Sequence, residues 1–337
     1  FAITTSNEVV YGDEVTFKTK EAVSHSESNC YIVATESEVI IPVSRANKSA
    51  LGTQVSTSDK LSAELIWMDN MDVVDTVFTY GNGSSGNLVV LTGNVNGNAV
   101  VAAKVNNKIV WSWHIWVNEN PSSIGTITLP SGEKIMDRNL GATEIGAVGL
   151  QYQFGRKDPF TASASLGTPS EILLYDLKGG NPVISTADGQ KNLAFATANP
   201  LTFIKSNYVD WCDQDIRTWW VNEDGTKTVY DPSPEGWRIA AIENYIGIDD
   251  TSFDKNYEGG YNFTYNGQSN FFPFTGYREV NGALDATAIV GNLWVNSPIP
   301  GDVGAGAAFC VEYGIHGVFA NGAPRARALC IRCVKEK

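Results

Sequence analysis

The last stretch of the chain contains two cysteines, Cys330 and Cys333, at the spacing of redox and zinc-binding thiols. A redox pair of this kind sits where a strand meets the start of a helix, because the helix amides lower the thiol pKa. Both residues instead lie in a stretch with a β-strand pattern, and the sequence offers no second pair of zinc ligands. We therefore interpret the pair as structural, and the isolated Cys30 as a buried thiol.

Tryptophan, tyrosine and carboxylate residues gather in two stretches of the second half, around 211–220 and 249–265. Aromatic faces beside carboxylates suit sugar recognition, in which rings stack on C–H faces and acids accept hydrogen bonds from hydroxyls. The alternative is that these rings pack the loops onto a sheet. The candidate ligand-binding residues are Trp211, Trp219, Trp220, Asp213, Asp215, Tyr257 and Tyr261.

The same acids would serve a hydrolase with paired carboxylates, but such an enzyme needs two carboxyl groups at a fixed separation, which a sequence does not give. No H-E-x-x-H motif, G-x-S-x-G elbow or Walker loop occurs, and the histidines are scattered. We therefore predict that the protein is not an enzyme and has no catalytic residue and no cofactor.

An oxygen-rich stretch offers Asp249, Asp250 and Asp254 as candidate cation ligands. Ca²⁺ is bound by several oxygen atoms, but the spacing here is not that of an EF-hand loop. We favour a solvated loop over a metal site.

The elements that carry these residues differ between the two halves of the chain. Residues 1–118 contain only short β-branched or aromatic runs, separated by turn residues such as Gly81-Asn82-Gly83. This pattern predicts an all-β sandwich of the Ig/fibronectin-like kind. The predicted strands cover residues 14–18, 31–34, 39–43, 64–68, 73–78, 88–91, 99–105 and 111–117.

The last of these strands alternates, with Trp111, Trp113, Ile115 and Val117 on one face. Its tryptophans are a candidate sugar-stacking platform, but such a strand more often packs a core, and we favour the core.

A polar segment with Pro121 follows, and we interpret residues 119–123 as a linker. Residues 124–337 combine strand patterns with long irregular stretches, which predicts an α+β domain whose loops carry its function. The one clear helix signal covers residues 234–246, where apolar residues follow a proline and an acid. The predicted strands cover residues 126–128, 133–136, 271–274, 307–313 and 328–334.

The formal net charge of −13 speaks against nucleic acid and anionic lipid as partners, because both require clustered lysine and arginine. No apolar run is long enough to span a membrane. The chain opens at Phe1 in a polar stretch, which we interpret as a trimmed or mature form.

Five segments of the second half form a recognisable set: Met136-Asp-Arg-Asn-Leu-Gly-Ala-Thr143, residues 149–160, Tyr230-Asp-Pro-Ser-Pro-Glu-Gly-Trp-Arg238, Phe274-Thr-Gly-Tyr-Arg278 and the ending Cys330-Ile-Arg-Cys-Val-Lys-Glu336. On these segments the second half resembles the Fibrobacter succinogenes major paralogous domain, a family found in surface lipoproteins of Bacteroidetes. The first half is similar to the β-sandwich that precedes this domain in fimbrillin-like proteins, on Asn29-Cys-Tyr-Ile-Val33 and residues 111–117.

The resemblance implies a divergent C-type-lectin-like fold for residues 124–337, with no catalysis. It also implies export to the outer-membrane surface or the extracellular space, with a lipid anchor upstream of Phe1. We expect a cell-adhesion protein that binds an extracellular glycan or a host or matrix protein through loops of the second half. The alternative is a structural subunit, at the tip or cap of a fimbria-like fibre, that contacts other subunits.

The family commonly has a cysteine where Ser233 stands, so its usual disulfide with the position of Cys333 does not form here. We expect Cys212 to replace it as the partner of Cys333. Cys310 and Cys330 lie in strands that we expect to be neighbours, which makes them a second candidate pair.

Overall fold

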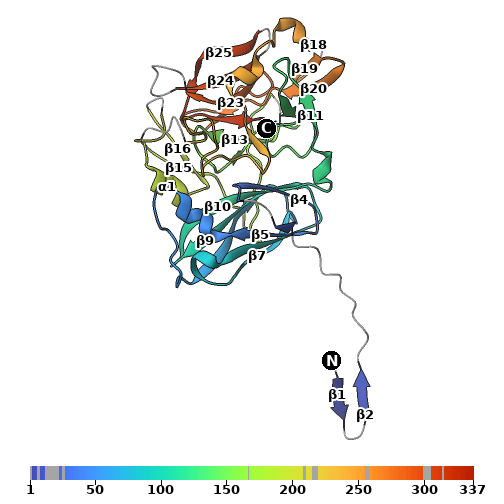
Figure 1. The fold of residues 1–337 in the computed structure, drawn as a ribbon, viewed down its shortest axis with the longest axis vertical. Coiled ribbons are helices and arrows are strands. Elements are labelled where there is room, and N and C mark those ends of the chain that lie inside the picture. The colour runs from blue at the N-terminus through green and yellow to red at the C-terminus, as the bar shows by residue number, and fades with distance from the viewer. Residues whose placement is uncertain are drawn as a thin grey trace.

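The protein is described by a computed structural model, which covers residues 2–5, 8–11, 23–24, 27–165, 167–207, 210–214, 219–254, 258–298, 305–312 and 315–337. It consists mainly of β-strands in several sheets (Figure 1). In the described ranges the only α-helix is α1 (Leu193–Ala198), and short 3-10 turns such as η1 (Val43–Lys48) supply the remaining helical residues. None of the described helices is long and apolar enough to cross a membrane.

Two four-stranded sheets form the first half. The first has the order β3 (Val23–Ser24), β5 (Glu38–Pro42), β8 (Asn87–Thr92) and β7 (Val74–Tyr80). The second has the order β4 (Cys30–Val33), β10 (Lys108–Val117), β9 (Gly97–Val105) and β6 (Leu61–Met68). The predicted strands from residue 31 to 117 are thus confirmed, and the one expected at 14–18 lies outside the described residues.

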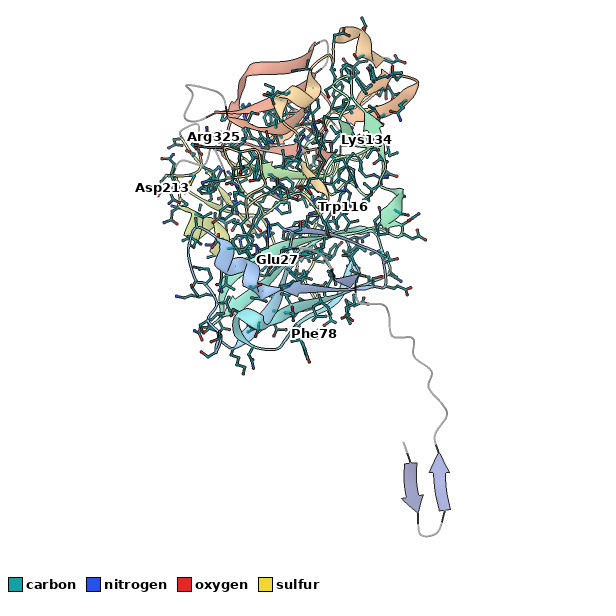
Figure 2. The ribbon with its side chains drawn as sticks, in the orientation of Figure 1. Glu27, Phe78, Trp116, Lys134, Asp213 and Arg325 are labelled. Carbon is teal, nitrogen blue, oxygen red and sulfur yellow. The ribbon has the colours of Figure 1, made fainter. Side chains whose placement is uncertain are left out.

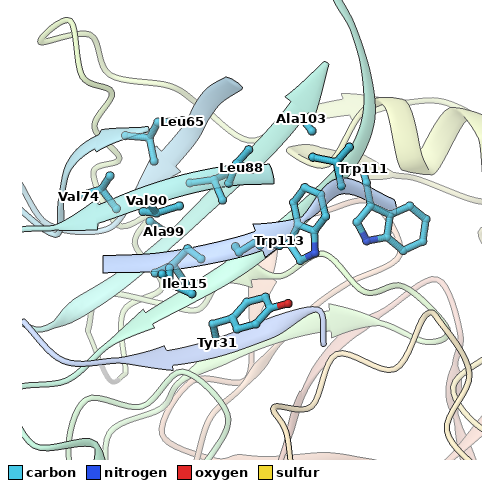
Figure 3. Packing of buried hydrophobic residues seen from close by; sticks show 14 of the residues in the cluster. Tyr31, Leu65, Val74, Leu88, Val90, Ala99, Ala103, Trp111, Trp113 and Ile115 are labelled. Carbon is cyan, nitrogen blue, oxygen red and sulfur yellow. The ribbon is translucent and has the colours of Figure 1, made fainter. Parts of the chain in front are cut away.

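The two sheets face each other across one apolar core. Leu88 and Val90 of β8 meet Ala99 of β9 and Trp113 and Ile115 of β10 in the same cluster (Figure 3). Because side chains alternate along a strand, each sheet turns every second residue toward this core. The first half is therefore a sandwich.

Strand β10 is buried on both faces. Trp111 and Trp113 point into the sandwich core, whereas Trp116 packs in a second cluster with residues of the other half. All three tryptophans are 0% exposed, so the core interpretation is confirmed and the sugar-stacking alternative is wrong.

Strands of the second half form one four-stranded sheet, one eight-stranded sheet and two smaller ones. The four-stranded sheet has the order β11 (Thr126–Thr128), β12 (Lys134–Met136), β27 (Cys333–Lys335) and β17 (Trp237–Ile239). The eight-stranded sheet contains β14 (Phe160–Thr161), β13 (Leu150–Gln153), β26 (Ala328–Ile331), β23 (Val290–Pro298), β24 (Ala305–Glu312), β25 (Ile315–Pro324), β21 (Tyr277–Arg278) and β22 (Leu284–Asp285). The smaller ones contain β15 (Ser185–Ala187) with β16 (Thr202–Ile204), and β18 (Phe253–Asp254), β19 (Gly260–Tyr265) and β20 (Gln268–Pro273).

The helix expected at residues 234–246 is wrong. Trp237 and Ile239 belong to β17, which pairs with β27, and only Ile242–Tyr245 forms a 3-10 turn, η4. Trp237 and Ile239 are two residues apart and both buried, which is a strand spacing that the helical pattern also accommodates. The five predicted strands of this half are confirmed, while its C-type-lectin-like architecture stays a prediction.

The two halves share a core. Trp67, Val100 and Trp116 of the sandwich lie in one cluster with Met136 and Leu140 of the second half. No named sheet among the described residues contains strands from both sides of the 119–123 segment, although isolated backbone bridges join Cys30 to Pro234 and Met68 to Tyr175. The division at 119–123 stays a prediction, and the shared core leads us to expect that the halves unfold together.

Hydrogen bonds also join the two halves of the chain. The Asn98 amide donates to the carbonyl oxygen of Gly141 over 2.9 Å. Gly141 has a φ of +81°, and a Cβ there would lie 2.7 Å from the Leu150 side chain. Only glycine combines this left-handed backbone with so close an approach.

Strands β1 (Ala2–Thr5) and β2 (Glu8–Tyr11) pair with each other and, within the described ranges, with no other strand. Figure 1 shows this hairpin apart from both halves.

Candidate functional site

Two of the predicted sugar-stacking tryptophans are part of the core. Trp211 is 0% exposed and Trp220 is 2% exposed. Their indole N–H groups donate to the carbonyl oxygens of Phe154 and Arg156, over 2.8 and 3.0 Å. Because neither ring reaches solvent, the prediction that they bind a ligand is wrong.

The other predicted positions are scattered. Tyr261 is buried against Phe274, with ring centroids 5.0 Å apart, so it too is a packing residue rather than a ligand contact. Asp213 is exposed, and Figure 2 shows it at the edge of the molecule. Asp215 and Tyr257 lie outside the described residues. Of the seven candidates, Trp219 alone lines a described cavity together with residues of both halves.

The loop with the candidate cation ligands is closed by its own hydrogen bonds. The Asp249 carboxylate accepts from the backbone N–H and the hydroxyl of Thr251, over 2.9 and 2.7 Å, and these bonds lower its pKa. Asp254 is exposed, and the Asp250 side chain lies outside the described ones. No group of three His, Cys, Asp or Glu side chains in the described ranges is arranged to hold a metal ion.

Neither predicted disulfide is present. Cys212, Cys330 and Cys333 are free, buried thiols, and Cys30 is a fourth. Strand β23 lies between β24, which contains Cys310, and β26, which contains Cys330, so the two strands are not neighbours as expected. A separation of two strand spacings, about 9–10 Å, is too large for a disulfide. Cys212 instead lies in a loop whose backbone is bridged to Lys191.

A groove of about 640 Å³ opens where the 3-10 turn η1 of the sandwich meets residues 219–230 of the second half. Its described lining comes from both halves, and Figure 2 labels Glu27 near this junction. The lining residues are Glu27, Arg45, Lys48, Ser49, Ala50, Trp219, Asn222, Lys227, Thr228, Val229 and Tyr230.

One side of the groove is aromatic. The half-buried Trp219 ring lies 5.6 Å from that of Tyr230 and 5.7 Å from that of Trp211, measured between centroids. The Tyr230 hydroxyl accepts from the backbone N–H of Ala50 over 2.9 Å, which joins this side to the turn after η1. Trp219 is therefore held between two rings and keeps part of its surface open to the groove.

Another part of the lining is cationic. Arg45 is 8% exposed, and burial lowers its pKa. Its guanidinium donates to the Glu27 and Val229 carbonyl oxygens, each over 3.0 Å, and its Nε donates to the Asn29 side chain over 2.9 Å. These neutral acceptors fix the guanidinium without neutralising its charge. Lys48 is more open, with 59% of its side chain exposed, and pairs with the Glu27 carboxylate over 2.5 Å.

The groove thus combines a stacking surface with hydroxyl, amide and ammonium groups. In its described lining Glu27 supplies the only carboxylate, and that carboxylate is paired with Lys48. Hydrolysis by paired carboxylates needs a second acid. The arrangement is suited to holding a polar ligand with an apolar face.

A second cluster of side chains that could do chemistry, Lys157, Ser112 and Asp158, is buried. Lys157 Nζ donates to Ser112 Oγ and lies 2.7 Å from Asp158 Oδ1, and burial lowers the pKa of Lys157 to about 8. Ser112 is 0% exposed and Lys157 is 4% exposed, so no substrate reaches this Lys–Ser pair. Its hydrogen bonds join Ser112 of the sandwich to Lys157 and Asp158 of the second half.

The sequence singled out Trp219 but not the rest of the groove. Arg45 and Lys48 belong to η1, far along the chain from Trp219, and neither lies in a motif. The clue available was Tyr230, which opens the segment Tyr230 to Arg238 and is an aromatic residue next to a loop. Only the packing of the halves brings these residues together.

No family model matches the chain, and no curated protein matches it. Solved structures similar to it include domains 5-6 of the S-layer protein SbsC, at 10% identity and a TM-score of 0.20, covering 92% of this chain and 96% of that one. Domains 4-9 of surface layer protein SbsC align at 10% identity and a TM-score of 0.19, covering 92% of this chain and 30% of that one. TM-scores this low do not establish a common fold.

Proposed function

We propose that this protein is an exported, non-enzymatic surface protein that binds an oligosaccharide in the groove lined by Trp219. The observation that carries the proposal is the half-buried Trp219 ring, held between Trp211 and Tyr230 at the side of a groove. A sugar ring stacks its C–H face on an indole while its hydroxyls bond to polar groups beside it. Asn222 and Thr228 are such groups in the lining. Export and surface location rest on the resemblance to the Bacteroidetes lipoprotein family.

A glycan array probed with three proteins tests this proposal: the unmodified chain, Trp219→Leu and Phe78→Leu. Leucine keeps apolar volume at position 219 but removes the stacking face. Phe78 is an exposed aromatic residue on the outer side of the sandwich (Figure 2), is not among the lining residues of the groove, and serves as the matched control. We expect specific signals to be lost in Trp219→Leu and kept in Phe78→Leu, with similar melting temperatures.

Equal signals from all three proteins would place the site elsewhere. The absence of any glycan signal from the unmodified chain would favour a protein ligand.

The second candidate function is a structural subunit of a surface fibre. The hairpin of β1 and β2 favours it, because in the described structure these strands pair only with each other and lie apart from both halves. Unpaired strand edges are templates for pairing with another chain. Polymers formed by the unmodified chain, and abolished when residues 1–11 are deleted, would support this candidate over the binding protein.

A further inference from the structure

We infer that the groove selects an anionic oligosaccharide, whose carboxylate or sulfate group is bound by Lys48 beside Arg45; this inference rests on the proposed binding function. The first observation is charge. The chain carries a formal net charge of −13, yet three cations, Arg45, Lys48 and Lys227, line this groove with a single carboxylate, Glu27. A neutral sugar needs no such concentration of positive charge.

Apart from Glu27, the carboxylates near these cations lie outside the described lining. Lys227 pairs with Glu336 over 3.1 Å and donates to the Trp237 carbonyl oxygen of β17 over 2.8 Å. Asp231 is buried and accepts from the backbone N–H of Ser233 over 2.7 Å. A ligand in the groove therefore meets the cations before it meets these acids.

Arg45 is preorganised to attract an anion. Its three hydrogen bonds, to Asn29, Glu27 and Val229, go to neutral oxygens and use three of its five N–H groups. The guanidinium is held in place before a ligand arrives, so its field acts on the groove without a cost in side-chain ordering.

Lys48 is the more exposed of the two cations. Its side chain is 59% exposed and its printed ion pair joins it to Glu27, whose side chain is 28% exposed. The Lys48 ammonium is open to solvent, whereas the Glu27 Oε2 atom with which it pairs is buried. A ligand anion therefore has to compete with this carboxylate for Lys48. Glu27 thus acts as an internal competitor for Lys48, and removing its charge favours the ligand.

Two substitutions of opposite sign test the inference. The probes are tetragalacturonate, which carries carboxylates, a sulfated galactan tetrasaccharide, and neutral galactotetraose, each titrated by calorimetry at low salt. Lys48→Met is expected to weaken binding of the anionic probes about tenfold, since a hydrogen bond to a charged group is lost, and to leave the neutral one unchanged. Glu27→Gln is expected to strengthen binding of the anionic probes severalfold. Lys48→Arg, which restores the charge, is expected to restore the affinity.

The two anionic probes separate the sources of negative charge: the tighter one identifies carboxylate or sulfate as the preferred group. Added salt should weaken both and spare the neutral probe. If all three probes bind with similar affinity, and Lys48→Met and Glu27→Gln bind like the unmodified chain while Trp219→Leu does not, the anion selectivity is wrong and the groove stands as a neutral-sugar site. If none of the probes binds, both the selectivity and the proposed function fail for these sugars.

Discussion

Lys157 Nζ donates to the backbone carbonyl oxygen of Ser112 over 3.0 Å, and this bond joins the segment after β13 to strand β10 of the sandwich. The ammonium also lies 4.5 Å from the centre of the Trp111 ring and pairs with the adjacent Asp158. A buried cation with a carboxylate, a carbonyl oxygen and an aromatic face around it is well compensated. The contact between the two halves is therefore held by specific, compensated polar interactions.

Replacing Lys157 with methionine should destabilise the protein by about 3–5 kcal/mol, because the Asp158 carboxylate remains buried without its cation. Urea unfolding followed by circular dichroism measures the change. Lys104→Met is the control, since Lys104 and Glu64 form a more exposed pair, for which we expect a change within about 1 kcal/mol. Equal effects of the two substitutions would show that the Lys157 cluster does not hold the halves together.

The shared core predicts one cooperative unfolding transition for both halves. Trp116 is 0% exposed and packs against residues of the second half, so Trp116→Ala should cost about 3–5 kcal/mol and lower the melting temperature of the whole chain. Tyr80→Ala, at a position that is 72% exposed, should change stability by no more than about 0.5 kcal/mol. Two separate calorimetric transitions, of which only one responds to Trp116→Ala, would contradict this expectation.

Stability should fall as the pH falls below 6.5, in part because of His114. Burial lowers the pKa of His114 from 6.5 to about 3, and its ring accordingly stays neutral in the folded chain. The Asn98 amide nitrogen donates to Asp69, so Asn98 Oδ1 faces His114 Nε2 over 2.9 Å and that nitrogen carries the hydrogen. Between about pH 3 and 6.5 the unfolded chain binds more protons than the folded chain, which lowers the free energy of unfolding.

His114→Gln keeps a hydrogen-bond donor but does not titrate. The free energies of unfolding of the two proteins, compared at pH 7.5, 6, 5 and about 4, should converge or cross as the pH falls. A constant difference across this range would show that His114 is not buried in its neutral form.

The described cysteines should react slowly with thiol reagents in the folded protein. Burial raises the pKa of both Cys212 and Cys330 to about 12 and that of Cys333 well above its usual range, so few thiolates exist at pH 8. Alkylation followed by peptide mass mapping should find them unmodified in the native chain and modified in urea. A peptide linked through Cys212 and Cys333 would instead restore the predicted disulfide.

The strands could be predicted from the sequence because the patterns that indicate them are local. Alternation in β10 and the turn residues between the sandwich strands depend only on neighbours in the chain. The helix predicted at 234–246 is wrong because Trp237 and Ile239 are compatible with both the helical and the strand periodicity. The pairing of β17 with β27, which the local sequence does not reveal, makes this segment a strand. Trp211 and Trp220 failed for a related reason: a tryptophan in a loop has the same sequence signature whether it faces solvent or the core, and both bond to the backbone of residues 154–156.

The groove itself was beyond sequence reasoning. Lys48 lies on η1 of the sandwich and Trp219 lies in a loop of the other half, and nothing in the intervening pattern relates them. Their proximity follows from the shared core and from bonds such as that of Asn29 to the Asp231 carbonyl oxygen, which form only after both halves have folded.

The most direct test of ligand binding at Trp219 is the indole N–H spectrum of protein labelled with ¹⁵N-tryptophan, titrated with tetragalacturonate. The Trp219 signal is identified by its absence in Trp219→Phe, and that of the buried Trp116 by its absence in Trp116→Phe. We expect the Trp219 signal to shift in a saturable way while the Trp116 signal stays fixed. Saturable shifts confined to other tryptophans, with Trp219 unmoved, would contradict the assignment of the groove as the binding site.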